Sequence, residues 1–192
     1  HMCQDVEAES ELRNLAAVPY QIISPANNSA IVGIYQDSML GSHLITRESV
    51  KFDKKKAMNL LMMSSRIDED KLRDMVRVSG FDLMTQIMPP LSLKYNSKPD
   101  MSFDEAEKAN AIVEIVNGKY VRGQMVKSVL GGGTKGLIHR ICNDFGNMAA
   151  SNFIDDIQNI VTEYLCGTSF SVGISDLLSD AKTKQGIVEV IE

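Results

Sequence analysis

Two amphipathic helices bounded by glycines constrain the fold of this chain more than any other stretch does. Residues 131–176 read GGGTKGLIHRICNDFGNMAASNFIDDIQNIVTEYLCGTSFSVGISD. Helical spacing predicts a first helix that ends at Gly146 in a left-handed cap and buries Leu137, Ile138, Ile141, Cys142 and Phe145. The second helix has a predicted buried stripe of Ala150, Ile154, Ile157, Val161, Tyr164 and Leu165, and a predicted solvent-facing set of Asn152, Asp155, Asp156, Asn159 and Glu163. Because one tight turn joins the helices, their stripes must pack against each other or against a neighbour.

The rest of the sequence predicts short helices and short strands, without an internal repeat. A helix is expected within residues 5–17, ahead of Pro19, and a second that includes Met39, Leu40, Leu44 and Ile45 on one buried face. Three more are expected over residues 53–62, 67–76 and 81–88. Gly80 is expected to stop the fourth of these helices, and Pro89-Pro90 the fifth. Two strand-like runs flank Asn117-Gly118, which predicts a hairpin over residues 111–124. The mixture predicts an α+β fold of short strands and hairpins packed with helices.

Composition excludes several classes of protein. The formal net charge of −5 over 192 residues argues against a dedicated nucleic-acid-binding module, which is normally basic. No apolar run approaches the roughly 20 residues of a membrane span. The three cysteines are far apart, which favours a reducing intracellular compartment over a disulfide framework. A soluble intracellular chain is therefore expected.

No catalytic constellation emerges from the residues themselves. The loop GGGTKG at 131–136 is followed by Leu137-Ile138, whereas a phosphate-binding loop needs Lys and Ser/Thr after its second glycine. His139 and Cys142 lie three residues apart without a second pair, so a packed histidine is favoured over a metal ligand. The pair Asp155-Asp156 is interpreted as a solvated helix face rather than an acid/base pair.

Several motifs, in the right order, resemble the largest subunit of multisubunit DNA-directed RNA polymerases of the eukaryotic, archaeal and large-DNA-virus type. They read AVPYQIISP at 17–25, GIYQD at 33–37, LITR at 44–47, KGLIH at 135–139 and FSVGISD at 170–176. The resemblance covers residues 4–47 and 112–192 well and the segment between them loosely. It implies the mixed α+β fold of the pore domain of that subunit.

The resemblance also implies a division of the chain and a function. Residues 1–18 would be the tail of the active-site region, 19–168 the pore domain, and 169–192 the start of the funnel domain. In the family this region borders the secondary channel, through which nucleotides enter and the 3′ end of backtracked RNA leaves. The family's magnesium-binding aspartate motif lies just upstream of the position matching His1. The fragment alone is therefore expected to be inactive and to hold no cofactor, with Mg²⁺ and structural Zn²⁺ expected in the full enzyme.

Motif matching nominates five channel residues. Asn28, Gln36 and Asp37 would lie near the RNA 3′ end, while Lys127 and Lys135 would meet phosphates. The family usually has Lys-Pro where this chain has Ser29-Ala30, and Lys135 replaces a common glycine. A capping or surface role is the alternative for each of the five.

The resemblance implies other polymerase subunits as partners, above all the second-largest, together with nucleoside triphosphates, the RNA 3′ end and, through the whole enzyme, template DNA. The location would be nucleus, cytoplasm or virion, according to the source. One competing hypothesis is a free-standing scaffold protein with a polymerase-derived fold, which binds a partner through the helix at 148–165. Another is a small phosphate-binding enzyme built on residues 131–136, whose nucleotide binding Gly133→Val would abolish.

Overall fold

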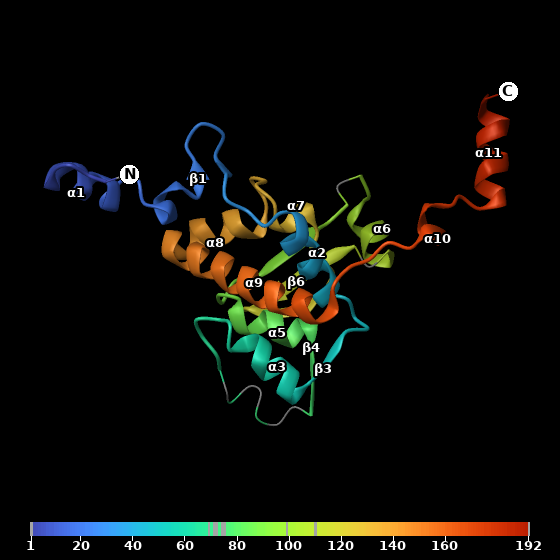
Figure 1. Cartoon of the computed structure of the whole chain (residues 1–192), viewed down its shortest axis with the longest axis horizontal. Coiled ribbons are helices and arrows are strands. Elements are labelled where there is room, and N and C mark those ends of the chain that lie inside the picture. Colours follow the sequence, from blue (N-terminus) through green and yellow to red (C-terminus); the bar gives the residue numbers. More distant parts are fainter. Residues whose placement is uncertain are drawn as a thin grey trace.

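The long helix α9 (Asn147–Thr168) runs through the body of the protein and collects the other elements around it (Figure 1). The computed structural model describes residues 2–68, 70, 73, 76–98, 100–109 and 111–191. Helices α8 (Leu137–Phe145), α2 (Gln36–Ile45), α3 (Lys54–Leu61) and α5 (Gly80–Ile87) all contact α9, as does the 3₁₀ helix η1 (Val18–Gln21). The predicted α+β class is confirmed.

Three small antiparallel sheets lie around this helical centre. The first pairs β1 (Ile23–Ser24) with β2 (Ser29–Ala30), and the second pairs β3 (Lys51–Asp53) with β4 (Arg77–Ser79). The third has the order β5 (Leu93–Asn96), β6 (Ile112–Val116), β7 (Lys119–Arg122). Asn117 and Gly118 both have positive φ, 48° and 77°, as a two-residue hairpin turn between β6 and β7 requires. The predicted hairpin is confirmed, whereas β5 has no counterpart in the sequence-based prediction.

The glycine-bounded helix pair forms as predicted, with two corrections. Phe145, which was predicted to be buried, is 37% exposed, because it is the last residue of α8 and lies at the turn into Gly146. Gly146 has a φ of 89° and lies between α8 and α9. Asp156, which was predicted to face solvent, is buried, and its carboxylate accepts hydrogen bonds from the Ser65 amide (2.7 Å) and hydroxyl (3.0 Å). The solvent-facing prediction for Asp156 is therefore wrong, because the loop after α3 covers that side of α9.

The hydrogen bonds between Asp156 and Ser65 can be tested by mutation of Asp156. Asp156→Ala is expected to lower the free energy of unfolding by about 1.5–3 kcal/mol, the range for hydrogen bonds to a charged group. The exposed neighbour Asp155 provides the control, since Asp155→Ala is expected to change stability by no more than about 0.5 kcal/mol. Urea unfolding of both variants measures the difference, and equal losses would contradict a specific role for the Ser65 contact.

Gly80 plays a different part from the one predicted. It is the first residue of α5 rather than the stop of a preceding helix, and the Ser79 hydroxyl accepts a hydrogen bond from the Asp82 amide in a capping box. Of the predicted helix over 67–76, residues 69, 71, 72, 74 and 75 lie outside the described part of the chain. A built Cβ at Gly80 would lie 1.8 Å from the Ile45 carbonyl oxygen, so α5 starts in close contact with the end of α2.

A charged link fixes the third sheet to its flanking helix. Arg122 on β7 pairs with Glu114 on β6 at 2.8 Å and with Glu107 on α6 (Phe103–Lys108) at 2.7 Å. The hydrogen bond from Arg122 is the main cause that lowers the pKa of Glu107. This carboxylate therefore helps to hold α6 on the sheet above its unfolded-state pKa, and the contribution is lost as the pH falls through the lowered value.

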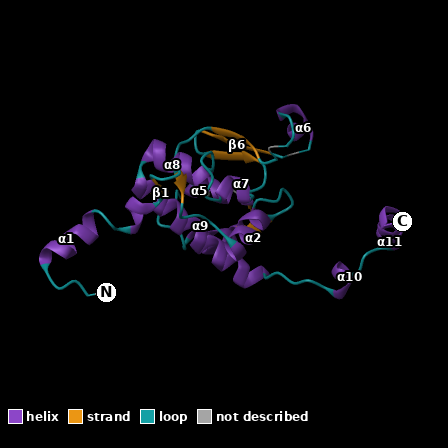
Figure 2. Ribbon diagram, turned by 90° about the horizontal axis from the view of Figure 1, so that it is seen from above, coloured by secondary structure: helices purple, strands orange, loops and turns teal. Residues whose placement is uncertain are grey.

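The two ends of the chain project from the body on opposite sides (Figures 1 and 2). Helix α1 (Val6–Asn14) buries none of its residues, and neither do α10 (Ile174–Leu177) and α11 (Ala181–Ile191). The main core cluster begins at Ile22 and ends at Tyr164. Within the described part of the chain, no helix combines the length and the apolarity needed to cross a membrane.

Candidate functional site

All five residues that the motifs nominated have exposed side chains, but they come from four separate segments. Asn28 lies in the turn between β1 and β2, and Gln36 and Asp37 are the first two residues of α2. Lys127 begins the short helix α7 (Lys127–Leu130), and Lys135 lies in the loop 131–136 ahead of α8. We call the surface formed by residues 23–37 and 127–136 the loop site.

Close backbone packing brings the two halves of the loop site together. The Ile34 amide donates a hydrogen bond to the Leu130 carbonyl at 3.3 Å. A built Cβ at Gly132 would lie 2.3 Å from the Ala30 carbonyl oxygen, a distance that only glycine tolerates. Figure 1 shows the β1–β2 hairpin, α2, α7 and the loop after α7 along the upper edge of the body, and Figure 2 looks down onto that edge.

A second set of contacts holds Met125, two residues before α7, against the C-terminal end of α2. The Met125 amide donates to the Thr46 hydroxyl at 3.0 Å, and His43 Nδ1 donates to the Met125 carbonyl at 3.2 Å. These contacts join residues 79 and 82 positions apart in the sequence. Lys127 is thereby held next to α2 by contacts that no local pattern in the sequence reveals.

Two of the nominated residues have an unusual backbone conformation. Asn28 has a φ of 48° and Gln36 a φ of 51°. Asparagine often adopts this left-handed region in turns, but glutamine rarely does, and the cost is of order 1–3 kcal/mol. Strain of this kind persists where the surrounding structure enforces it, and it clusters at binding sites.

The charges of the loop site are free to meet a ligand. Within the described part of the chain, neither Lys127 nor Lys135 has an ion-pair partner. Both ammonium groups are exposed, and Gly136 caps α8 without a side-chain hydrogen bond. The nominated residues of the loop site provide two cations, two side-chain amides and a carboxylate, which suits the binding of phosphates and nucleotide edges rather than covalent chemistry.

The other two candidate residues of the sequence, His139 and Cys142, are buried in α8. His139 is 8% exposed, and the Asn143 side-chain amide donates to its Nδ1 at 3.3 Å. Cys142 donates its thiol to the Asn147 side-chain oxygen at 3.0 Å, and burial raises the pKa of this thiol. The prediction of a packed histidine is confirmed. Among the described residues, no three His, Cys, Asp or Glu side chains form a group that could hold a metal ion.

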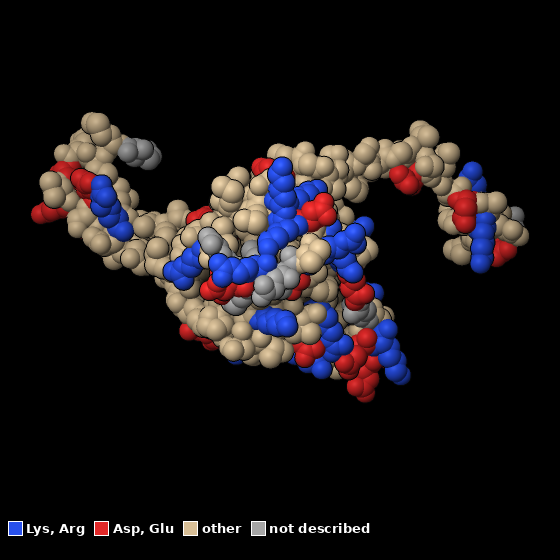
Figure 3. All heavy atoms as spheres, turned by 90° about the horizontal axis from the view of Figure 1, so that it is seen from below, with Lys and Arg blue, Asp and Glu red and all other residues tan. Residues whose placement is uncertain are grey.

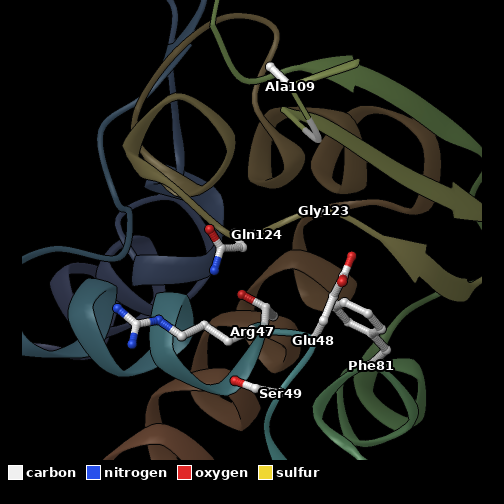
Figure 4. Close-up of a pocket in the computed structure, with 8 residues that line it drawn as sticks. Arg47, Glu48, Ser49, Phe81, Ala109, Gly123 and Gln124 are labelled. Atoms are coloured by element: carbon white, nitrogen blue, oxygen red, sulfur yellow. The ribbon is translucent and has the colours of Figure 1, made fainter. Parts of the chain in front are cut away.

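A separate hollow of about 390 Å³ lies beyond the end of α2 (Figure 4). In Figure 4 the Arg47 side chain leads away from Glu48 and Phe81, so the guanidinium and the carboxylate do not converge. None of the five nominated residues lines it. Its lining residues are Thr46, Arg47, Glu48, Ser49, Phe81, Ala109, Gly123 and Gln124.

Comparison with known families shows to which protein family the chain belongs. The family described as RNA polymerase Rpb1, domain 3, matches residues 21–177, which include both halves of the loop site. The chain belongs to this family. The resemblance stated from the motifs is thereby confirmed.

Individual proteins with similar sequences are also subunits of DNA-directed RNA polymerases. DNA-directed RNA polymerase subunit 1 of Acanthamoeba polyphaga mimivirus is 28% identical over 193 aligned residues. The RPB1-A and RPB1-B subunits of DNA-directed RNA polymerase II from Trypanosoma brucei brucei are each 26% identical over 194. In all three cases the whole chain is covered, but it spans only 12% of the viral relative and 11% of the trypanosomal ones.

Proposed function

We propose that this chain is part of the largest subunit of a DNA-directed RNA polymerase, where it forms a wall of the channel that admits nucleotides and receives the 3′ end of backtracked RNA. The observation that carries the proposal is the close packing of residues 127–136 against residues 30–37. It brings together the two segments that carry Asn28, Gln36, Asp37, Lys127 and Lys135, which supports a shared role for these residues in a channel wall.

The chemistry of this edge suits a passage for nucleotides. Lysine side chains attract phosphates and release the counterions bound to them. This release becomes less favourable as the salt concentration rises, so the attraction weakens. Amide and carboxylate groups meet the edges of unpaired bases. Because the site has no nucleophile paired with a base, it would guide and hold the RNA rather than cut or join it.

The distribution of burial supports the proposed division into domains. Residues 19–168 would be the pore domain, and the main core cluster lies within them. Residues 1–18 would belong to the active-site region and 169–192 to the funnel, and neither segment has a buried residue among those described. Such arms would bury their apolar side chains against other parts of the enzyme.

The metals of the full enzyme would be held elsewhere. In the complete enzyme Mg²⁺ would supply the charge stabilisation for nucleotidyl transfer. The residues of this chain would contribute positioning, and other subunits, above all the second-largest, would complete the channel.

Two neighbouring glycines provide a matched test. Gly132→Ala is expected to push the loop 131–136 away from β2, because the new methyl group would lie 2.3 Å from the Ala30 carbonyl oxygen. Gly133→Ala is the control, since a Cβ there would meet nothing within 4 Å. The polymerase that carries each variant would be halted on DNA and assayed for its lifetime in the backtracked state.

We expect Gly132→Ala to change this lifetime by about tenfold, equivalent to roughly 1.4 kcal/mol, and Gly133→Ala to leave it unchanged. Normal backtracking by an assembled Gly132→Ala enzyme would argue against a channel role for the loop site.

A further inference from the structure

An exposed aromatic ring lies within the loop site, between the start of α2 and the glycine loop. Tyr35 is 47% exposed, although it directly precedes α2 and follows the buried Ile34. A built Cβ at Gly33 would lie 3.0 Å from the Tyr35 hydroxyl oxygen and 3.1–3.2 Å from two ring carbons. A built Cβ at Gly132 would lie 3.2 Å from the same hydroxyl oxygen. The ring therefore rests on two backbone positions that lack a side chain.

This packing holds the ring in place without burying it. Gly33 and Gly132 come from the two halves of the loop site, so the ring bridges them. The left-handed residue Gln36 directly follows Tyr35 and turns the chain into α2. A tyrosine that served only the core would be buried, as Tyr120 and Tyr164 are. Tyr35 keeps about half of its surface available instead.

The groups around Tyr35 match the way proteins bind unpaired nucleotides. Single-stranded RNA is recognised by aromatic rings that stack on bases, by polar side chains that meet the base edges, and by cations that meet the phosphates. Gln36 and Asp37 follow the ring directly in the chain. Lys135 lies three residues after Gly132, in the loop on which the ring rests.

We propose that Tyr35 stacks on an unpaired nucleobase held at the loop site. The inference rests on the proposed function, because the nucleotide would reach the site through the channel. Two sources share this chemistry: the displaced 3′ end of a backtracked RNA and an entering nucleoside triphosphate. Stacking tolerates any base, so Tyr35 would hold the nucleotide without selecting its sequence.

The test uses elongation complexes of the polymerase that carries this chain within its full-length subunit. In one arm the RNA ends in two mismatched nucleotides, the last of them 4-thiouridine, which crosslinks to its neighbours under ultraviolet light. In the other arm the RNA is fully paired and free 4-thiouridine triphosphate is added. The variants are Tyr35→Phe, which keeps the ring, and Tyr35→Leu, which removes it. Phe103→Leu is the control, since Phe103 is an exposed aromatic residue (54%) on α6.

We expect crosslinks to residues 31–37 and 131–135 in the unmodified enzyme, in Tyr35→Phe and in Phe103→Leu, and an about tenfold lower yield at residues 131–135 in Tyr35→Leu. The arm that produces them identifies the source of the nucleobase. Equal crosslinking to residues 131–135 in the unmodified enzyme and in Tyr35→Leu would overturn the stacking role and leave the channel proposal intact. The absence of crosslinks to residues 23–37 and 127–136 in both arms would overturn both proposals.

Discussion

Phe153→Ala is expected to lower the free energy of unfolding by about 3–5 kcal/mol, the usual cost of removing a buried aromatic ring. Phe153 is 1% exposed and is the largest of the fully buried side chains that the structure describes. It lies on α9, which contacts α8, α2, α3, α5 and η1. A cavity at this position would weaken the packing of several elements at once. Because domains have only about 5–15 kcal/mol of stability in total, the loss would be severe.

Urea unfolding of the purified chain measures this effect. The control is Phe103→Ala on α6, where the ring is 54% exposed and little packing is lost. The control is expected to change stability by no more than about 0.5 kcal/mol. Similar unfolding midpoints for the two variants would contradict the central place of α9 in the core.

Gly80→Ala is expected to be the most disruptive of the glycine-to-alanine substitutions, because a built Cβ at Gly80 makes the shortest contact of any glycine. The new Cβ would lie 1.8 Å from the Ile45 carbonyl oxygen and 2.9 Å from its carbonyl carbon. Because both neighbours are backbone atoms, the end of α2 and the start of α5 must move apart. Overpacking of this kind costs typically 1–3 kcal/mol, and more where the backbone cannot yield. Thermal unfolding monitored by circular dichroism would reveal the loss.

Gly167→Ala provides the matched control for Gly80→Ala. Gly167 lies near the end of α9, and a Cβ there would meet nothing within 4 Å. Alanine favours a helix over glycine by roughly 0.5–1 kcal/mol, so this variant is expected to be slightly more stable. A Gly80→Ala protein that melts at the same temperature as Gly167→Ala would show that α2 and α5 do not meet as described.

The positions of the two glycine-bounded helices could be predicted because helical spacing and a capping glycine are local features of the sequence. Helical spacing predicted the burial of Leu137, Ile138, Ile141 and Cys142 on α8 but wrongly included Phe145, and Gly146 marked the boundary between α8 and α9. The same periodicity did not identify Phe153 and Ile160 as buried, because α9 is covered on more than one side. It placed Asp156 in solvent because nothing local announces that Ser65 will cover it.

Other features depend on contacts between distant segments. Strand β5 was missed because its sequence, LKYN, is short and is stabilised by pairing with β6. Gly80 was interpreted as a helix stop. In the structure its lack of a side chain allows the start of α5 to pack against the Ile45 carbonyl. The motifs nominated the five channel residues, but the close approach of Gly132 to Ala30 and the support for the Tyr35 ring became visible only in the folded chain.

The central claim is that this sequence belongs to a polymerase subunit much longer than 192 residues. The most direct measurement captures the native protein from its source with an antibody against this sequence, and determines both its size and its ability to make RNA on a DNA template. The account predicts a chain far larger than 21.2 kDa, captured together with other subunits and active in templated RNA synthesis. A free chain near 21.2 kDa, captured without any such synthesis, would contradict it and leave the scaffold hypothesis in its place.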